Sequence, residues 1–245
     1  MTEPRAGKAA IRKHGVFHLK YEAIILCGGE GWRLKPDEWT PKPLLKITET
    51  ESLLDMQVRW LVDNGFDNIV LASNRSFPES DMFTSRKVQM CTERKKLGTG
   101  GAVKRAAVLI DTDRFYVMNV DDVAFYDPRT LYDRATTGAA ILLAKPRLPF
   151  GKVTLQGDDI VKGFEHRPIL DMWVSAGHYV FSSGIVEKYF PAYGDFEHTA
   201  MQQIAGDNLL RGLKYPGDWL TLNTAKDLIA IQEYMKNMKV SRKHG

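Results

Sequence analysis

Residues 23–34 read AIILCGGEGWRL and join a short apolar run to a glycine-rich segment. The apolar residues are typical of a buried strand. Glycines that follow a strand let backbone amides approach a ligand closely, and turned amides form a concave site for an anion. Arg33 adds a positive charge, and Lys42 adds a second one within Thr40-Pro41-Lys42-Pro43-Leu44-Leu45. This combination suits a highly charged anion, and a nucleoside triphosphate fits it best.

Two standard phosphate-binding motifs do not occur in this stretch. No Lys-Ser or Lys-Thr pair closes the glycine segment, so it is not a Walker loop. Residues 29–34 lack the third glycine of a dinucleotide-binding fingerprint. The competing interpretation is a tight turn without a ligand. Arg33 and the Pro41-Lys42-Pro43 triplet favour the anion site.

Apolar runs alternate with helical patterns along the first half of the chain. A buried strand is expected at residues 23–27, further strands at 68–72, 88–91 and 115–118, and helices between Ser52 and Gly65 and at 102–110. The alternation predicts an α/β fold, with a single-domain, Rossmann-like, mostly parallel sheet flanked by helices. In such sheets ligands bind beyond the carboxyl ends of the strands, where both glycine-rich segments and Asp121 fall.

The second half of the chain is less regular. Strands are expected at residues 138–145 and 174–181, an antiparallel pair at 153–155 and 160–164, and helices at 197–205 and 224–238. His178 falls within a strand and is expected to be structural. We expect this half to form the acceptor side of the pocket.

The composition is that of an ordinary globular protein. The 245 residues are 44% hydrophobic and 26% charged, which suits one sizeable core. No apolar run approaches the roughly 18 residues that indicate a membrane span, and the basic N-terminus lacks an apolar signal core. We therefore expect a cytoplasmic protein with no membrane partner, in which Cys27 and Cys91 are buried free thiols.

The formal net charge of +4 can come entirely from the first twenty residues. Residues 1–20 are expected to form a solvated, mobile basic tail, and residues 239–245 a second, shorter one. Interleaved aromatic residues and a sustained basic stripe are both missing, so no nucleic-acid partner is expected. The positive balance would instead help to attract phosphorylated substrates.

Several motifs resemble those of one enzyme family. The pattern Gly28-Gly29-x-Gly31-x-Arg33-Leu34, followed by Pro41-Lys42-Pro43, looks like the signature of the sugar-1-phosphate nucleotidyltransferases, also called nucleotide-sugar pyrophosphorylases. Further blocks resemble the same family in the same order, at residues 97–102, 115–121, 176–181 and 217–219. The Leu-Cys-Gly-Gly and Leu-Gly-Thr-Gly-Gly-Ala sequences look most like those of the heptose-1-phosphate guanylyltransferase branch.

The resemblance implies a reaction and its partners. A nucleoside monophosphate would pass from a triphosphate, with GTP favoured, to a sugar 1-phosphate, giving a nucleotide sugar and pyrophosphate, with Mg²⁺ as cofactor. Residues 21–135 would form the nucleotide-binding half of the domain, and residues 136–238 the sugar-phosphate-binding half. The family often associates, so a homo-oligomer is an open expectation.

Three residues are expected to be catalytic. Asp121 lies at a strand end and is the expected Mg²⁺ ligand, the competing interpretation being a turn or helix-cap carboxylate. Arg33 would bind the β- and γ-phosphates, and Lys42 would neutralise the α-phosphate as charge builds there. Asp122 is a second carboxylate at this point and is expected to face outward.

The remaining candidates would bind the two substrates. Glu93 would accept hydrogen bonds from guanine, or is a solvated charge beside Arg94. Arg167 stands where the family often has Lys and would hold the sugar phosphate, or is a surface cation. Glu197 would contact the sugar, or is favoured by a helix dipole. The expected nucleotide-binding residues are Leu26, Gly28, Gly29, Gly31, Glu93, Gly98, Thr99 and Gly100, and the sugar-phosphate-binding residues are Arg167, Gly177 and Glu197.

Two positions depart from the family pattern. Val120 replaces the glycine of Asn-Gly-Asp, and Thr221 replaces the second metal-binding carboxylate of a Trp-x-Asp-x-Gly block. Asn223 is then the candidate for a second metal ligand, with Asp218 as an alternative. Otherwise Asp121 and the phosphates would hold the metal alone.

Two other functions stay open. One is a nucleotide-sugar-binding regulator of the same fold with weak catalysis or none. The other is a metal-dependent glycosyltransferase that uses Asp121 and Asp122 on a nucleotide sugar. Arg33 and Lys42 argue against the second, because such an enzyme needs no triphosphate site.

Overall fold

The structure is a computed structural model that describes residues 20–28, 40–75, 77 and 88–241. The predicted basic tails, apart from residues 20 and 239–241, lie outside these described residues, as do the candidate residues Gly29, Gly31 and Arg33. Within the described ranges, no helix has the length and apolar character needed to cross a membrane.

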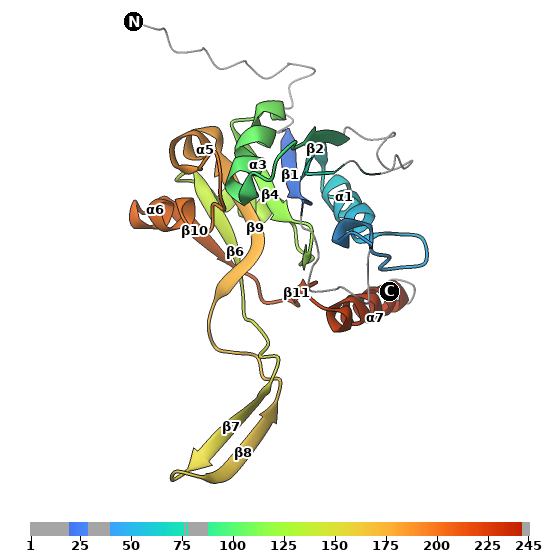
Figure 1. Ribbon diagram of the computed structural model, residues 1–245, viewed down its shortest axis with the longest axis vertical. Helices are drawn as coiled ribbons and strands as arrows, with labels where there is room; N and C mark the ends of the chain where they lie inside the picture. Colours follow the sequence, from blue (N-terminus) through green and yellow to red (C-terminus); the bar gives the residue numbers. More distant parts are fainter. Residues whose placement is uncertain (1–19, 29–39, 76, 78–87, 242–245) are drawn as a thin grey trace, which may run out of the picture.

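A seven-stranded sheet forms the centre of the described chain, in the order β10-β6-β9-β4-β1-β2-β3 (Figure 1). Strand β9 is antiparallel to both of its neighbours, and the other neighbouring pairs are parallel. This confirms the predicted mostly parallel α/β sheet. The strands are β1 (Tyr21–Leu26), β2 (Phe66–Ser73), β3 (Val88–Thr92), β4 (Arg114–Asn119), β6 (Ala139–Ala144), β9 (Val174–Ser182) and β10 (Leu210–Lys214).

Helices cover both faces of the sheet. Ala23 and Ile25 of β1 belong to the apolar cluster that includes helices α1 (Leu53–Asp63), α4 (Arg129–Arg134) and α7 (Ala225–Ser241). Ile24 and Leu26 belong to the opposite cluster, which includes α3 (Gly98–Ala106), α5 (Ser183–Tyr189) and α6 (Ala200–Gly206). A strand buried on both faces is apolar throughout, which explains the continuous apolar run in the sequence.

Short elements lie outside the central sheet. Strands β5 (Asp122–Val123) and β11 (Leu220–Thr221) pair antiparallel, and so do β7 (Gly151–Gln156) and β8 (Ile160–His166). The described residues also include the 3-10 helices η2 (Lys42–Leu44) and η3 (Ala107–Leu109). The β7–β8 hairpin confirms the predicted antiparallel pair, and Figure 1 shows that it projects far from the body of the molecule.

Two helices begin at residues other than those predicted from the sequence. Helix α3 begins at Gly98 rather than residue 102, because its glycines pack directly against residues 191–194 in the first turn. Helix α6 begins at Ala200 rather than at residue 197. The residues just before α6 are instead held by Thr99, whose hydroxyl accepts the amide of Phe196.

The capping box predicted at Ser52 is present. The Ser52 hydroxyl accepts the amide of Asp55 at 3.2 Å, and the Asp55 carboxylate accepts the amide of Ser52 at 2.9 Å. Gly65, with a φ of +86°, follows the helix end as expected. The cap fixes where α1 begins, directly after the segment that carries Lys42.

We expect Ser52→Ala to lower the free energy of unfolding by about 1 kcal/mol, because the Asp55 amide loses its acceptor and the Asp55 carboxylate loses the Ser52 hydroxyl donor. Urea unfolding measures the effect. Thr50→Ala, at an exposed neighbouring position, is the matched control and should change stability little. Equal stability of the Ser52 variant and the wild type would contradict the assigned cap.

Candidate active site

Lys42 and Asp121, which are 79 residues apart in sequence, form an ion pair of 2.7 Å between Nζ and Oδ2. The Lys42 side chain is 12% exposed and that of Asp121 is 27% exposed. Asp121 lies two residues after the end of β4, at the carboxyl edge of the parallel strands. The structure therefore brings together two of the three residues that the sequence predicts to be catalytic, at the predicted edge of the sheet.

The segment that carries Lys42 is tied to helix α1. Pro41 precedes η2, and its fixed φ suits the start of a helical turn. Leu45 follows, and its side chain is buried. The backbone carbonyl of Leu45 accepts the amide of Leu53, the first residue of α1, at 2.9 Å. This packing holds the Lys42 ammonium over the end of β4.

The turn that carries Asp121 is held from three sides. The Val120 amide donates to the carbonyl of Leu26 at 3.1 Å, and the Leu222 amide donates to the carbonyl of Asp121 at 2.9 Å. The buried Gln57 amide of α1 donates to the carbonyls of Val120 and Asp122 at 3.2 and 2.8 Å. Sequence reasoning missed Gln57, although a glutamine on the apolar face of a helix is a detectable signal.

Val120 does not obstruct the ligand side of this turn. Its side chain is buried in the core cluster beside α1, with an exposed fraction of 4%. The valine that replaces the family's glycine therefore contributes to packing.

Asp122 faces inward, so the expectation that it faces outward is wrong. It is 7% exposed, and its two oxygens accept from Asn119 Nδ2 at 3.0 Å and from Trp219 Nε1 at 3.1 Å. Burial, with a further contribution from the charge of Asp121, raises the pKa of Asp122 to about 7. The carboxyl group thus joins the β4–β5 turn to strand β11.

Gly177 provides the space for this carboxyl group. Its φ is +72°, and a Cβ atom at this position would overlap the Asp122 side chain. The glycine is therefore required by Asp122 itself, in the strand that faces it. The predicted approach of a sugar to Gly177 stays a prediction.

His178 is structural, as expected from its place in a strand. Its Nε2 lies 3.1 Å from the carbonyl of Asp122, which can only accept, so Nε2 carries the proton and Nδ1 accepts from the Tyr116 hydroxyl at 2.7 Å. Burial lowers the pKa of His178 to about 4, and the ring is neutral at pH 7.

Thr99 and Glu197 join the two predicted halves of the domain. The Thr99 hydroxyl donates to Glu197 Oε2 at 2.5 Å, and the Thr99 amide donates to Asp195 Oδ1 at 2.9 Å. Burial raises the pKa of Glu197. Because α6 begins only at Ala200, the helix-dipole interpretation of Glu197 does not hold.

The glycines beside Thr99 serve packing. A Cβ atom on Gly98 would lie 2.5 Å from the carbonyl carbon of Gly194, and the Gly100 amide donates to the Gly194 carbonyl at 2.9 Å. Backbone packing alone therefore accounts for these glycines. Whether they also frame a base stays a prediction.

The structure also describes the surroundings of three other predicted residues. The carbonyl of Leu26 is taken by Val120, and a Cβ atom on Gly28 would make only ordinary contacts with Asn74. Glu93 Oε2 accepts the amide of Leu97 at 3.1 Å, where α3 begins. The competing interpretation of Glu93 as a purely solvated charge is therefore incomplete.

Arg167 is placed at the foot of the projecting hairpin (Figure 1). It follows β8, has a φ of +50°, and is exposed. Its carbonyl accepts from Arg147 Nη1 at 3.1 Å. Its predicted contact with the sugar phosphate stays a prediction.

Asn223 lies beside the Asp121 turn. Leu222 binds the carbonyl of Asp121, and the Asn223 side-chain amide donates to the Thr221 hydroxyl at 3.2 Å. In the part of the chain that the structure describes, no three His, Cys, Asp or Glu side chains cluster closely enough to hold a metal ion. Cys27 and Cys91 are buried and free, as predicted.

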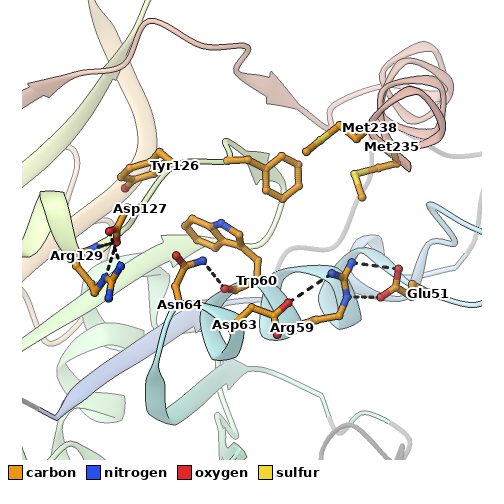
Figure 2. Close-up of a pocket in the computed structure, with 11 residues that line it drawn as sticks. Glu51, Arg59, Trp60, Asp63, Asn64, Tyr126, Asp127, Arg129, Met235 and Met238 are labelled. Atoms are coloured by element: carbon orange, nitrogen blue, oxygen red, sulfur yellow. Dashed lines mark hydrogen bonds and ion pairs between the residues drawn. The ribbon is translucent and has the colours of Figure 1, made fainter. Parts of the chain in front are cut away.

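A cavity of about 660 Å³ lies elsewhere, between α1, the segment after β5, and α7 (Figure 2). Its guanidinium groups are already paired, Arg59 with Glu51 at 2.6 Å and Arg129 with Asp127 at 2.7 Å. Its lining includes none of the residues predicted to bind substrate. The apolar part of the lining is Trp60, Phe125, Tyr126, Met235 and Met238.

The family model described as nucleotidyl transferase matches residues 22–236, almost all of the domain described above. The chain belongs to this family. Membership agrees with the resemblance seen in the sequence motifs and with the position of the Lys42–Asp121 pair at the carboxyl edge of the sheet.

This member of the nucleotidyl transferase family is similar over most of its own length to several named proteins. The chain is 26% identical over 226 residues to the mannose-1-phosphate guanylyltransferase catalytic subunit beta of Danio rerio, and 27% identical over 228 residues to the mannose-1-phosphate guanyltransferase of Yarrowia lipolytica. Each match covers 85% of this chain and 62% of the relative. The chain thus spans less than two thirds of these relatives' length.

Solved structures share the fold. HddC from Yersinia pseudotuberculosis complexed with GMP-PN matches with a TM-score of 0.66 at 22% identity, over 88% of this chain and 99% of that chain. A UDP-glucose pyrophosphorylase complexed with UDP-glucose matches with a TM-score of 0.67 at 14% identity, over 90% of this chain and 100% of that chain.

We expect Gly177→Ala to lower the free energy of unfolding by at least about 3 kcal/mol, because the new methyl group meets the Asp122 carboxyl group and the positive φ is strained. Urea unfolding is the measurement. Gly184→Ala is the matched control, since a Cβ atom there meets nothing within 4 Å. Similar stability of the two variants would contradict the assigned contact.

His178 makes a pH-dependent contribution to stability. Its pKa is lower in the folded state than the usual 6.5, so the unfolded chain binds more protons below pH 6.5 and the folded state is destabilised as the pH falls towards 4. Between pH 7 and 5 this amounts to about 2 kcal/mol. His178→Gln should be less stable than the wild type at pH 7. Between pH 7 and 5 its free energy of unfolding should fall by about 2 kcal/mol less than that of the wild type. Parallel stability profiles for the two proteins would contradict the assignment.

Proposed function

We propose that the chain transfers a nucleoside monophosphate from a nucleoside triphosphate, with GTP favoured, to a sugar 1-phosphate, releasing pyrophosphate. The observation that supports this best is the Lys42–Asp121 ion pair at the carboxyl edge of the sheet, in a member of the nucleotidyl transferase family. The Lys42 ammonium can attract substrate phosphates directly. The Asp121 carboxylate can bind a metal cation that attracts them in turn.

The reaction requires two negatively charged groups to meet. A phosphate oxygen of the sugar 1-phosphate attacks the α-phosphorus of the triphosphate, and the bond to the leaving pyrophosphate breaks in line. Lys42, held on η2 against the end of β4, neutralises the charge that develops on the α-phosphate. Arg33, outside the described residues, is proposed to bind the β- and γ-phosphates.

The donor set near Asp121 suits Mg²⁺. The carboxylate of Asp121 is partly exposed, and the segment that carries Thr221 and Asn223 binds the same turn through the Leu222 amide, so the candidate ligands are hard oxygen donors. We propose Asp121 as the main protein ligand and Asn223 as a second, with substrate phosphates supplying the rest. The ion would offset phosphate charge during transfer.

The residues proposed to bind the two substrates lie in different halves of the domain. The nucleotide would lie over Leu26, Gly28, Gly29 and Gly31, with Glu93 and residues 98–100 near the base. The Thr99–Glu197 hydrogen bond connects this side to the sugar side, where Gly177 and Arg167 are proposed to act.

The relatives favour a guanine nucleotide. Two of them are named guanylyl- or guanyltransferases of mannose 1-phosphate, and HddC was solved with GMP-PN. The glycine-rich motifs of the sequence resemble those of the heptose-1-phosphate guanylyltransferase branch of the family. Mannose 1-phosphate and a heptose 1-phosphate are therefore the first sugars to test.

Pyrophosphate release from a panel of five common nucleoside triphosphates and several sugar 1-phosphates tests the proposal. Release should require Mg²⁺ and both substrates, and should be fastest with GTP. Asp121→Asn should lower kcat by about a thousandfold, and Lys42→Ala should raise the barrier by about 2–4 kcal/mol. Both variants should remain folded by circular dichroism.

Matched controls separate these effects from a general loss of charge. Asp67→Ala, at the exposed amino end of β2, and Lys236→Ala, on the exposed side of α7, should keep wild-type rates. No release across the whole panel would overturn the proposal. So would an Asp121→Asn variant with near-native turnover.

One observation favours a second candidate, a nucleotide-sugar-binding regulator of the same fold. Thr221 stands opposite Asp122 in the β5–β11 pair, where the family pattern has a metal-binding carboxylate. A regulator would bind a nucleotide sugar in calorimetry and would show no exchange of labelled pyrophosphate into triphosphate. Such exchange would exclude this candidate.

A further inference from the structure

Within the described residues, the end of β4 offers a cation one outward carboxylate, that of Asp121. The neighbouring Asp122 faces inward, and its two oxygens accept hydrogen bonds from Asn119 and Trp219. In the described chain, no His, Cys or further acidic side chain joins the two aspartates to make a cluster that could hold a metal ion. The charge of Asp121 therefore decides how well the protein alone attracts a cation here.

This carboxylate already has a cationic partner. Lys42 Nζ lies 2.7 Å from Asp121 Oδ2, and the two side chains are 12% and 27% exposed. A partly buried ion pair is screened less by salt than a pair in open water. Removal of one partner from such a pair leaves the other charge poorly compensated. The two charges thus balance each other in this structure.

A divalent cation on Asp121 would meet the Lys42 ammonium. The two cations would lie within a few ångströms of each other on one carboxylate, where a single and a double positive charge repel each other strongly. One negative charge cannot offset three positive charges. A cation that binds Asp121 must therefore displace Lys42 or bring further negative charge with it.

A nucleoside triphosphate supplies that negative charge. Mg²⁺ in proteins is commonly held by one or two carboxylates together with substrate phosphates. The same phosphates offer Lys42 a new partner. Lysine suits such a change, because its compact charge lies at the end of a flexible four-carbon stem. The helical turn η2 can stay in place meanwhile, held by the hydrogen bond between Leu45 and Leu53.

We propose that Lys42 and the divalent cation compete for Asp121, and that the triphosphate ends this competition by taking the Lys42 ammonium. The chain without nucleotide then binds the cation weakly, and the cation binds together with the triphosphate. The proposal rests on the function proposed above, in which Asp121 is the metal ligand. It gives the ion pair a second role, which is to balance the metal-binding carboxylate until the substrate arrives.

A Mn²⁺ titration of the full chain without nucleotide tests the competition. Mn²⁺ accepts the same oxygen ligands as Mg²⁺, and it broadens the NMR signals of nearby protons. The Trp219 indole N–H donates to Asp122, next to Asp121, and reports binding at this site. Lys42→Ala should lower the Mn²⁺ Kd by at least about tenfold relative to the wild type. Addition of Asp121→Asn to this variant should remove the gain.

Two further variants separate the effect of charge from that of space. Lys42→Arg keeps the positive charge and should bind Mn²⁺ as weakly as the wild type. Lys46→Ala removes an exposed lysine of the same segment, which donates to the carbonyl of Thr50, and should also match the wild type. Equal Mn²⁺ affinity of Lys42→Ala and the wild type would overturn the proposal. So would a gain that persists in the presence of Asp121→Asn.

The same titration with GTP, in the absence of a sugar phosphate, tests the change of partner. Here the effect of Lys42→Ala should reverse, with the Kd of the Mn²⁺–GTP complex raised by at least about tenfold, because the ammonium now contacts the phosphates. Unchanged or tighter binding of this complex by Lys42→Ala would overturn the transfer of Lys42 and would indicate a permanent ion pair.

Failure of the proposed function would give a different result. A wild type that binds no Mn²⁺ complex of GTP or of the other triphosphates in the panel would overturn that function and, with it, the transfer of Lys42. The titration without nucleotide decides the competition for Asp121 by itself.

Discussion

The position of the Asp121 carboxylate depends on a turn whose backbone carbonyls are all in use. Gln57 of α1 takes the carbonyls of Val120 and Asp122, and Leu222 takes that of Asp121. Buried carbonyls are costly to leave without a partner, so the turn has little freedom to move. Lys42 then meets a carboxylate that is already fixed in place. Preorganised charge of this kind stabilises a transition state without reorganisation during the reaction.

The same turn explains the residues around it. Because Asp122 points inward, the facing strand needs glycine at position 177 and the β11 segment supplies Trp219 as a donor. His178 remains neutral and holds the carbonyl of Asp122. These contacts draw on β9, β11 and α1 at once. The candidate site is thus assembled from both halves of the chain, and it loses its geometry if any one of these elements shifts.

Sequence reasoning reached the elements with local signals. The apolar runs identified six of the seven strands of the sheet and missed β10, which is partly exposed. The Ser52 box identified the start of α1. The strand-end rule placed Asp121 at the ligand edge, and the motif resemblance assigned Lys42 to the same site. Sequence reasoning could not give the direction of Asp122, because that depends on Gly177, more than fifty residues away. Nor could it separate a glycine that faces a ligand from Gly98, which packs on a distant backbone. Such contacts have no local pattern.

The central claim is that Lys42 and Asp121 act as one unit at the reacting phosphates. A double-mutant cycle on kcat/KM for pyrophosphate release, with Lys42→Ala, Asp121→Ala and the double variant, measures this directly. The account predicts strong non-additivity, with a coupling of about 2 kcal/mol or more and a double variant scarcely slower than the slower single one. Simple addition of the two single effects would show that the residues act independently and would contradict the claim.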